Sequence, residues 1–171
     1  MKTVVLLYDT SCIYEIVILN YFLKVTGKEM LFVSLDGKEI TATEGYRIAP
    51  EERLEHVDPK DVELLVIPGG DIAKIDTPGV WEYLKSVHEM GGQIAAICAA
   101  VDVVEHAGLL EGIESTHSCE KDVVTSDRIT TSRANGYVDF AIEVARQMEL
   151  FEDEADLQET IAFWREFQRM E

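Results

Sequence analysis

The sequence predicts an α/β protein in which a mostly parallel sheet is covered by helices on both faces. Short apolar runs recur along the chain, turn residues bound most of them, and amphipathic segments with helical periodicity separate them. Strands that alternate with helices in this way form βαβ units, which cover a parallel sheet from both sides. A chain of 171 residues has the size of a single domain, expected here to span residues 1–171.

The elements can be placed in order from the two kinds of periodicity. Continuous apolar runs are typical of buried parallel strands, and a 3.6-residue period indicates a helix. Strands are expected at 2–8, 29–36, 61–70 (ending in a glycine turn), 93–98, 122–125 and 128–132, with a β-hairpin over 38–48 that turns at Glu44-Gly45. Helices are expected at 13–25, capped by Thr10 or Ser11 and ended by Gly27, and at 81–90, 99–107, 137–149 and 154–170.

Charge, hydropathy and cysteine content narrow the possible functions and locations. The net charge is −18, from 33 acidic and 15 basic residues, so binding to nucleic acid is disfavoured. No apolar run reaches the length of a membrane span, and the first residues do not resemble a signal peptide. We therefore expect a soluble, cytoplasmic protein whose three cysteines are free thiols.

Cys98 is the first candidate for a reactive group. It stands in "IAAICAA", where a buried strand ends and a helix begins, which is the setting of a nucleophile elbow. Amides at the start of a helix lower the pKa of a thiol. Free cysteine is also among the residues most often buried in a core. From the pattern alone, Cys98 is either a nucleophile or an inert core thiol.

Glu15 and a glycine pair are further candidates at the same edge of the sheet. Glu15 heads an apolar helical stripe, where a carboxylate is either partly solvated in the first turn or buried and paired. Gly69 and Gly70 follow a buried strand, and their amides either face a developing oxyanion or form an ordinary turn. Ligands of parallel α/β sheets bind beyond the carboxyl ends of the strands, where these residues are expected.

A metal site is disfavoured. No C-x-x-C or H-x-x-x-H spacing connects the side chains that such a site would need, namely Cys12, Cys98, His117 and Cys119. Glu105 and His106 lie further along the helix after the thiol and are expected to be surface residues that point away from the turn. We expect no cofactor and no metal, and a small-molecule electrophile as the binding partner.

Four segments, taken in order, carry a family resemblance: "LLVIPGG", "IAAICAA", "EHAGLLEGIESTHS" and "TTSRANGYVDFAIEVARQM". They resemble motifs of the ThiJ/PfpI family, which includes the parkinsonism-associated protein deglycase and the PfpI intracellular proteases. The resemblance runs from the first strand to about residue 150. It implies a flavodoxin-like three-layer sandwich, similar to class I glutamine amidotransferases, and a homodimer.

The resemblance also implies roles for individual residues. The family's cysteine on the elbow corresponds to Cys98, its first-helix glutamate to Glu15, and its oxyanion-type amides to Gly70 and Ala99. An ionised Glu15 would raise the pKa of the thiol, whereas a protonated Glu15 would donate a hydrogen bond to the thiolate and could move a proton to a substrate. His117 could supply an imidazole from a neighbouring loop, as Thr-His or Ser-His does in similar family members.

Two departures from the family patterns narrow the function. In PfpI-type proteases a histidine directly follows the nucleophile, but here that position is Ala99. This replacement disfavours proteolysis because the base is missing. The deglycase branch has Gly-Pro two and three residues after the cysteine, where this chain has Ala100 and Val101. Deglycase activity is therefore not assured by the resemblance.

Three functions compete. In the first, Cys98 attacks a small carbonyl-type electrophile, as in a glyoxalase, deglycase or hydratase that protects against stress. In the second, oxidation of Cys98 makes the protein a non-catalytic redox sensor or a chaperone-like protein, with Cys12 or Cys119 as a candidate redox partner. The third, an intracellular peptidase or amidase, is disfavoured by Ala99.

The acidic segment 151–171 lies beyond the resemblance. Its apolar residues form two helical stripes, Leu157, Ile161 and Trp164 on one side and Phe163, Phe167 and Met170 on the other. Such a helix packs either on its own domain or in a dimer contact. We expect it to pack on its own domain.

Overall fold

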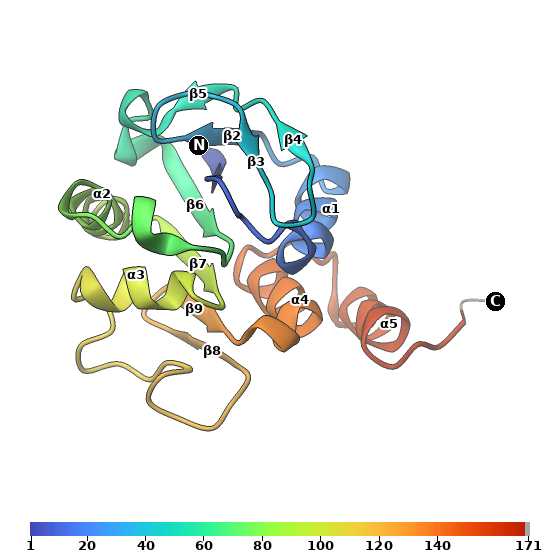
Figure 1. Ribbon diagram of the computed structural model, residues 1–171. Helices are drawn as coiled ribbons and strands as arrows, with labels where there is room; N and C mark the ends of the chain where they lie inside the picture. The colour runs from blue at the N-terminus through green and yellow to red at the C-terminus, as the bar shows by residue number, and fades with distance from the viewer. Residues whose placement is uncertain (170–171) are drawn as a thin grey trace.

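The computed structural model describes residues 1–169 and shows a seven-stranded sheet between two layers of helices (Figure 1). Neighbouring strands are parallel except at one edge, where the last two are antiparallel. The predicted α/β class with a mostly parallel sheet is therefore confirmed. From edge to edge, the strands are β5 (Glu52–Arg53), β2 (Met30–Ser34), β1 (Lys2–Leu6), β6 (Val62–Ile67), β7 (Gln93–Ile97), β9 (Ile129–Ser132) and β8 (Val123–Ser126).

The helices cover both faces because successive residues of each strand point to opposite sides of the sheet. In β1, Val5 faces one layer, while Val4 and Leu6 face the other, and all three are fully buried. The first layer contains α1 (Val17–Val25) and α4 (Tyr137–Gln147), with α5 (Glu154–Trp164) packed outside them; the second contains α2 (Pro78–Glu89) and α3 (Ala100–His106). This is the three-layer sandwich that the family resemblance implies.

Short elements fill the connections between these strands and helices. The predicted β-hairpin consists of β3 (Ile40–Thr41) and β4 (Arg47–Ile48), which pair antiparallel. Its turn contains Glu44-Gly45, and the positive φ of 90° at Gly45 suits glycine. The 3₁₀ turns are η1 (Ile13–Glu15), η2 (Leu54–His56), η3 (Pro59–Asp61), η4 (Ile72–Lys74) and η5 (Ala134–Gly136).

The prediction of one continuous helix from Ile13 is wrong. Only the 3₁₀ turn η1 forms there, and the α-helix begins later, at α1. Neither predicted cap acts on it, because Ser11 Oγ accepts a hydrogen bond from the Tyr8 amide (3.0 Å) and Thr10 Oγ1 accepts one from the Asp71 amide (2.7 Å). The two hydroxyls instead fix the loops that follow β1 and β6.

The C-terminal segment packs on the layer formed by α1 and α4. The ring of Trp164 lies 5.7 Å from that of Phe22 and 5.9 Å from that of Tyr21, measured between centroids. Helix α5 ends earlier than predicted, and Phe167 has a positive φ of 57°, which a right-handed helix cannot include. The predicted contact of Met170 lies outside the described residues.

The fold gathers the candidate functional residues at the carboxyl edge of the central strands. From β1 the chain adds β2 and β5 on one side, and only then β6 and β7 on the other. The crevice between β1 and β6 is therefore the switch point, where parallel sheets bind their ligands. Among residues 1–169, no helix is both long and apolar enough to cross a membrane.

Candidate active site

Cys98 occupies a strained turn between β7 and α3. Its φ is +59°, a conformation that costs a non-glycine residue about 1 kcal/mol. The neighbouring backbone holds it there, since the Cys98 amide donates to Ser132 O (2.8 Å) and Cys98 O accepts from the Val101 amide (3.2 Å). This is the strand–turn–helix geometry of a nucleophile elbow, which presents the side chain at the edge of the sheet.

The side chain of Glu15 is buried beside this turn and is only 1% exposed. The amide of Gly69 donates a 2.6 Å hydrogen bond to its Oε2, and the Tyr14 hydroxyl lies 3.4 Å from its Oε1. Burial raises the pKa of Glu15 above its ordinary value; hydrogen bonds from Gly69, Cys98 and Tyr14 oppose this rise, and the negative charge of Glu44 adds to it. Glu15 is therefore a carboxyl that retains its proton more readily than one in water.

The thiol and the carboxyl form one unit. Burial raises the pKa of Cys98 to about 11, and the charge of Glu15 and a hydrogen bond with it contribute to the rise, while a hydrogen bond from the Ala99 amide opposes it. Two interacting acids titrate as a pair. Between the raised pKa of Glu15 and about 11, the pair therefore holds a single proton. Its position, on sulfur or on oxygen, sets the reactivity of the thiol.

The backbone of Gly69 lies next to both members of the pair. A methyl group there would lie 2.7 Å from Glu15 Oε2, 2.7 Å from Cys98 Cβ and 3.0 Å from Cys98 Sγ, so only glycine fits without displacing both side chains. Sequence reasoning placed the Gly69 amide among the oxyanion donors. The structure instead gives this amide to Glu15.

The other two predicted oxyanion donors, the amides of Ala99 and Gly70, belong to the residues directly after Cys98 and Gly69. Ala99 is the residue directly after the thiol, and its amide is a hydrogen-bond donor to the Cys98 sulfur. Gly70 has a φ of +148°, and a side chain there would come within 2.5 Å of Thr10 O, so this position also requires glycine. Their assignment as oxyanion donors stays a prediction.

The side chain of Cys98 lines a small cavity. Its volume is about 290 Å³, near the lower end of ligand-binding cavities, which suits a molecule of a few heavy atoms. The structure thus brings the predicted residues Cys98 and His117 to one site. The cavity is lined by Cys98 and by residues from α3, the loop before β8 and the end of β9. These residues are Val101, Thr116, His117, Ser132 and Arg133.

Two carboxylates hold His117 at the rim of this cavity. Its Nδ1 lies 2.9 Å from Glu105 Oε2 and its Nε2 lies 3.3 Å from Asp102 Oδ1. Glu105 and His106 are exposed, as predicted, but Glu105 also orients His117, which the sequence reasoning missed. The three-residue spacing of Asp102 and Glu105 on one helix face was the available signal.

The other two cysteines, Cys12 and Cys119, differ in their relation to the Glu15–Cys98 pair. Cys12 precedes η1, and its negative charge, when ionised, would raise the pKa of Cys98 further. Cys119 Sγ is 3.3 Å from Ser115 O, and this thiol is absent from the described lining of the Cys98 cavity. All three thiols are free. Of the two candidate redox partners, Cys12 is the one whose charge affects the pKa of Cys98.

Side chains of metal-ligand type approach one another differently from the combination considered in the sequence. Within residues 1–169, the group whose ligand atoms lie within 4.8 Å of one another is Asp102, Glu105 and His117. These are the same atoms that form the two ion pairs of His117, so the contacts are satisfied among themselves. They include none of the three thiols.

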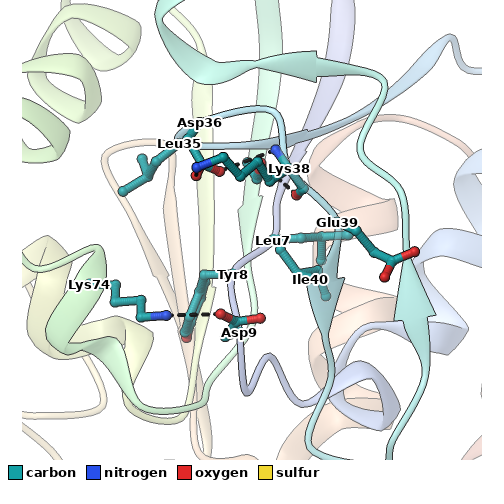
Figure 2. Close-up of a pocket in the computed structure, with 10 residues that line it drawn as sticks. Leu7, Tyr8, Asp9, Leu35, Asp36, Lys38, Glu39, Ile40 and Lys74 are labelled. Carbon is teal, nitrogen blue, oxygen red and sulfur yellow. Dashed lines mark hydrogen bonds and ion pairs between the residues drawn. The ribbon is translucent and has the colours of Figure 1, made fainter.

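A second cavity of about 290 Å³ lies beyond the ends of β1 and β2 (Figure 2). Lys74 pairs with Asp9 at 2.8 Å and Lys38 with Asp36 at 3.0 Å, so the ammonium groups facing this hollow are neutralised by neighbouring carboxylates. Tyr8 forms part of its wall and donates from its hydroxyl to Pro68 O at 2.7 Å. The cavity contains no thiol, and we assign the chemistry to the one at Cys98.

Comparison with known proteins identifies the family. The DJ-1/PfpI family profile matches residues 1–147, which include every member of the site. The chain belongs to the DJ-1/PfpI family. It is 28% identical over 151 residues to "Glutathione-independent glyoxalase DJR-1.2" of Caenorhabditis elegans, covering 79% of this chain and 81% of that protein. It is 32% identical over 126 residues to "Putative cysteine protease YraA" of Bacillus subtilis, covering 63% and 73%.

Solved structures show the same fold. The DJ-1 superfamily protein Atu0886 from Agrobacterium tumefaciens superposes with a TM-score of 0.86 at 23% identity, covering 98% of this chain and all of that one. The flavodoxin-like sandwich implied by the sequence motifs is thereby confirmed. At 23% identity, this match supports the fold and nothing further.

The raised pKa of Glu15 predicts a gain in stability when its charge is removed. The folded-state pKa lies above the unfolded-state value, so ionisation opposes folding, and stability is lost as pH rises from the unfolded pKa through the folded one. Glu15→Gln should therefore unfold at higher denaturant concentration than the wild type at neutral pH, by on the order of 1 kcal/mol. The advantage should shrink towards pH about 4, where the unfolded carboxyl is also protonated.

Urea unfolding of both proteins across this pH range measures the difference. Glu29→Gln is a matched control, because Glu29 is an exposed acid with its side chain 67% accessible. It should show no comparable pH-dependent gain. Equal stability of Glu15→Gln and wild type at every pH would contradict the assignment of Glu15 as a carboxyl destabilised by its burial.

Proposed function

We propose that this protein adds the Cys98 thiol to a small carbonyl compound of the α-oxoaldehyde class, with Glu15 moving the protons. The observation that carries the proposal is a thiol on a strained elbow and a buried carboxyl of raised pKa that meet at Gly69. A carboxyl of raised pKa is a stronger base than an ordinary glutamate, which suits it to accept the thiol proton. The small cavity and the relative named as a glyoxalase support this choice of substrate.

The first step is an addition. As the bond between Cys98 sulfur and the aldehyde carbon forms, the thiol proton passes to the Glu15 carboxylate and the carbonyl π electrons move to oxygen. Amides of Ala99 and Gly70 are the proposed donors to that oxygen. Glu15 then returns the proton to the oxygen, which gives a neutral hemithioacetal. No external reagent is required.

The second step is an internal rearrangement followed by hydrolysis. Glu15 removes the proton from the former aldehyde carbon and delivers it to the neighbouring carbon, while the hydroxyl proton passes from the oxygen on the first carbon to the oxygen on the second. The first carbon is thereby oxidised and the second reduced. The product is a thioester of a 2-hydroxy acid on Cys98. Water then attacks the thioester carbonyl, releases the 2-hydroxy acid and returns the proton to the sulfur. Atoms and electrons balance without a cofactor.

A redox role is the second candidate, favoured by the position of Cys12. Both Cys12 and Cys98 are partly exposed, and each thiol raises the pKa of a common neighbour, Tyr8. A peroxide would oxidise the Cys98 thiolate to a sulfenic acid, and the Cys12 thiol would condense with it to a disulfide, releasing water. A peptidase role has less support, since Ala99 stands where a protease would place its histidine.

Turnover of methylglyoxal tests the proposed enzyme. Cys98→Ser should lower the rate by at least about 10³-fold because the nucleophile is lost. Glu15→Gln should lower it by about 10² to 10⁴-fold because the amide cannot take up a proton. Formation of the 2-hydroxy acid, followed by nuclear magnetic resonance, measures all three proteins without a coupling enzyme.

Cys119→Ser is the control, because it removes a thiol outside the described cavity lining and should retain the wild-type rate. Wild-type protein that releases no hydroxy acid, together with peroxide oxidation of Cys98 that forms a disulfide with Cys12, would replace the enzyme with the redox function. Turnover that survives Cys98→Ser would contradict the assignment of Cys98 as the nucleophile.

We also propose that two copies associate through the outer face of α1 and the turn before it. Large apolar side chains at three- and four-residue spacing line this face and are 45–60% exposed: Tyr14, Val17, Tyr21 and Val25. This stripe is the exposed face of α1, opposite the face buried in the core. Its apolar side chains lose contact with water when a second copy covers them. The family resemblance, which implies a homodimer, supports a second copy as the occupant.

Sedimentation velocity should give the wild type a mass twice the 19.2 kDa of one chain. Val17→Asp should shift it to the mass of a single chain, since a charge in the centre of the contact cannot be desolvated without cost. Met90→Asp places the same charge on another exposed apolar residue, 62% accessible at the end of α2, and should leave the dimer intact. A wild-type monomer at all concentrations would contradict the proposal.

A further inference from the structure

The turn that carries Glu15 has no cap of its own. Its N-cap residue, Cys12, provides no side-chain hydrogen bond to the turn. The first amides of any helical turn have no partner within the turn and require an acceptor from elsewhere. Here the acceptor comes from the β3–β4 hairpin, where Glu44 Oε1 accepts a 2.8 Å hydrogen bond from the Tyr14 amide. The Ile13 amide also donates to Glu44.

Further contacts bind this hairpin to the loop that precedes η1. The Thr10 amide donates to Thr41 O (2.8 Å), the Thr43 amide donates to Ser11 O (3.0 Å), and the Thr41 amide donates to Asp9 Oδ1 (2.9 Å). The hairpin is thus fixed to the chain between β1 and η1 at several points. These contacts hold Glu44 against the turn that carries Glu15.

We propose that Glu44 is a positioning residue, which fixes the turn that bears Glu15 and by its negative charge keeps a proton on the Glu15–Cys98 pair. The inference deepens the proposed function, on which it rests. Glu44 does not touch the substrate cavity described above, and it acts through Glu15. Because the hairpin turn lies far from Glu15 in the sequence, no local motif indicates this role.

The charge of Glu44 supports the electrostatic half of the proposal. Partial burial alone would raise the pKa of Glu44, but hydrogen bonds from the amides of Tyr14, Glu44 and Ile13 lower it below its ordinary value. Glu44 is therefore ionised at neutral pH. Its charge in turn raises the pKa of Glu15, in addition to the larger effect of burial.

Other titratable groups also face the pair and must be separated from Glu44 in any test. They come from the loop after β1 and from the turn η1 with its N-cap: Tyr8, Cys12 and Tyr14. The thiols and phenols carry no charge in acidic solution, so the titration of Glu15 there reports on Glu44.

The rate of Cys98 alkylation by iodoacetamide, read by mass spectrometry of the full chain between about pH 4 and about pH 9, tests the inference. Alkylation should rise where Glu15 loses its proton, because the pair then holds one proton and part of it is thiolate. Glu44→Gln keeps an acceptor oxygen for the turn but removes the charge. It should move this rise to lower pH by roughly 0.3 to 1 pH unit, a change of about 2- to 10-fold in rate at a fixed acidic pH.

Glu44→Ala removes both the charge and the acceptor. The rise should shift as in Glu44→Gln, and turnover of methylglyoxal should fall in addition, because the turn is no longer held. Glu39→Gln is the matched control, since it removes one negative charge from the same hairpin at a residue that pairs with Arg47. It should leave the pH of the rise unchanged.

Each outcome decides one question. An unshifted rise in Glu44→Gln contradicts the electrostatic role, and an unchanged turnover in Glu44→Ala contradicts the positioning role. An equal shift in Glu39→Gln would show that any charge on the hairpin has the effect, which also contradicts a role specific to Glu44. A shifted rise in a protein that does not turn over methylglyoxal would contradict the proposed enzyme and leave the effect of Glu44 on the pair intact.

Discussion

The site depends on one hydrogen bond, from the amide of Gly69 to the buried carboxyl of Glu15, 2.6 Å long. A carboxyl that is 1% exposed has lost nearly all its water, and this amide replaces part of that solvation. The carbonyl of the same residue accepts from the Cys12 amide (2.9 Å), so Gly69 binds the catalytic turn at two points. Because Gly69 lacks a side chain, the Cys98 thiol and the Glu15 carboxyl can both approach its backbone closely.

This arrangement trades stability for reactivity. Cys98 is held at a positive φ, Glu15 is buried with a raised pKa, and the thiol pKa is raised to about 11. Each of these is unfavourable in a folded protein, and the two apolar layers of the sandwich compensate for them. The result is a pair of acids that hold one proton between them across neutral pH. In the proposed addition to a carbonyl, this proton moves from sulfur to oxygen as the bond from sulfur to carbon forms.

Sequence patterns were sufficient for the framework of the fold and for the strand–turn–helix setting of Cys98, because a buried strand, a small-residue turn and a helix follow one another locally. They left open whether the thiol is a nucleophile or a core thiol, and the family resemblance favoured the nucleophile. The burial of Glu15 could not be settled from its own segment, since a first-turn acid and a buried acid share one pattern. Its partners lie in distant segments: Gly69 comes from the loop after β6 and Glu44 from the hairpin. Contacts of this kind follow from strand order, which local periodicity does not encode.

The same limit explains the broken first helix. Thr10 and Ser11 are good caps by residue type, and the pattern after them is helical. In the folded chain their hydroxyls serve the amides of Asp71 and Tyr8, so the turn at Ile13 is left to a distant acceptor. A tertiary contact thus replaced a local one at the turn that carries Glu15.

The central claim is that Glu15 and Cys98 share a proton. Titration of the ¹³C-labelled Glu15 carboxyl by nuclear magnetic resonance, in the wild type and in Cys98→Ala, tests it most directly. We expect the carboxyl of the wild type to titrate above its ordinary pKa and to sense a second ionisation near 11, and we expect Cys98→Ala to abolish the second step. A Glu15 carboxyl that titrates at its ordinary value and is indifferent to loss of the thiol would contradict the claim.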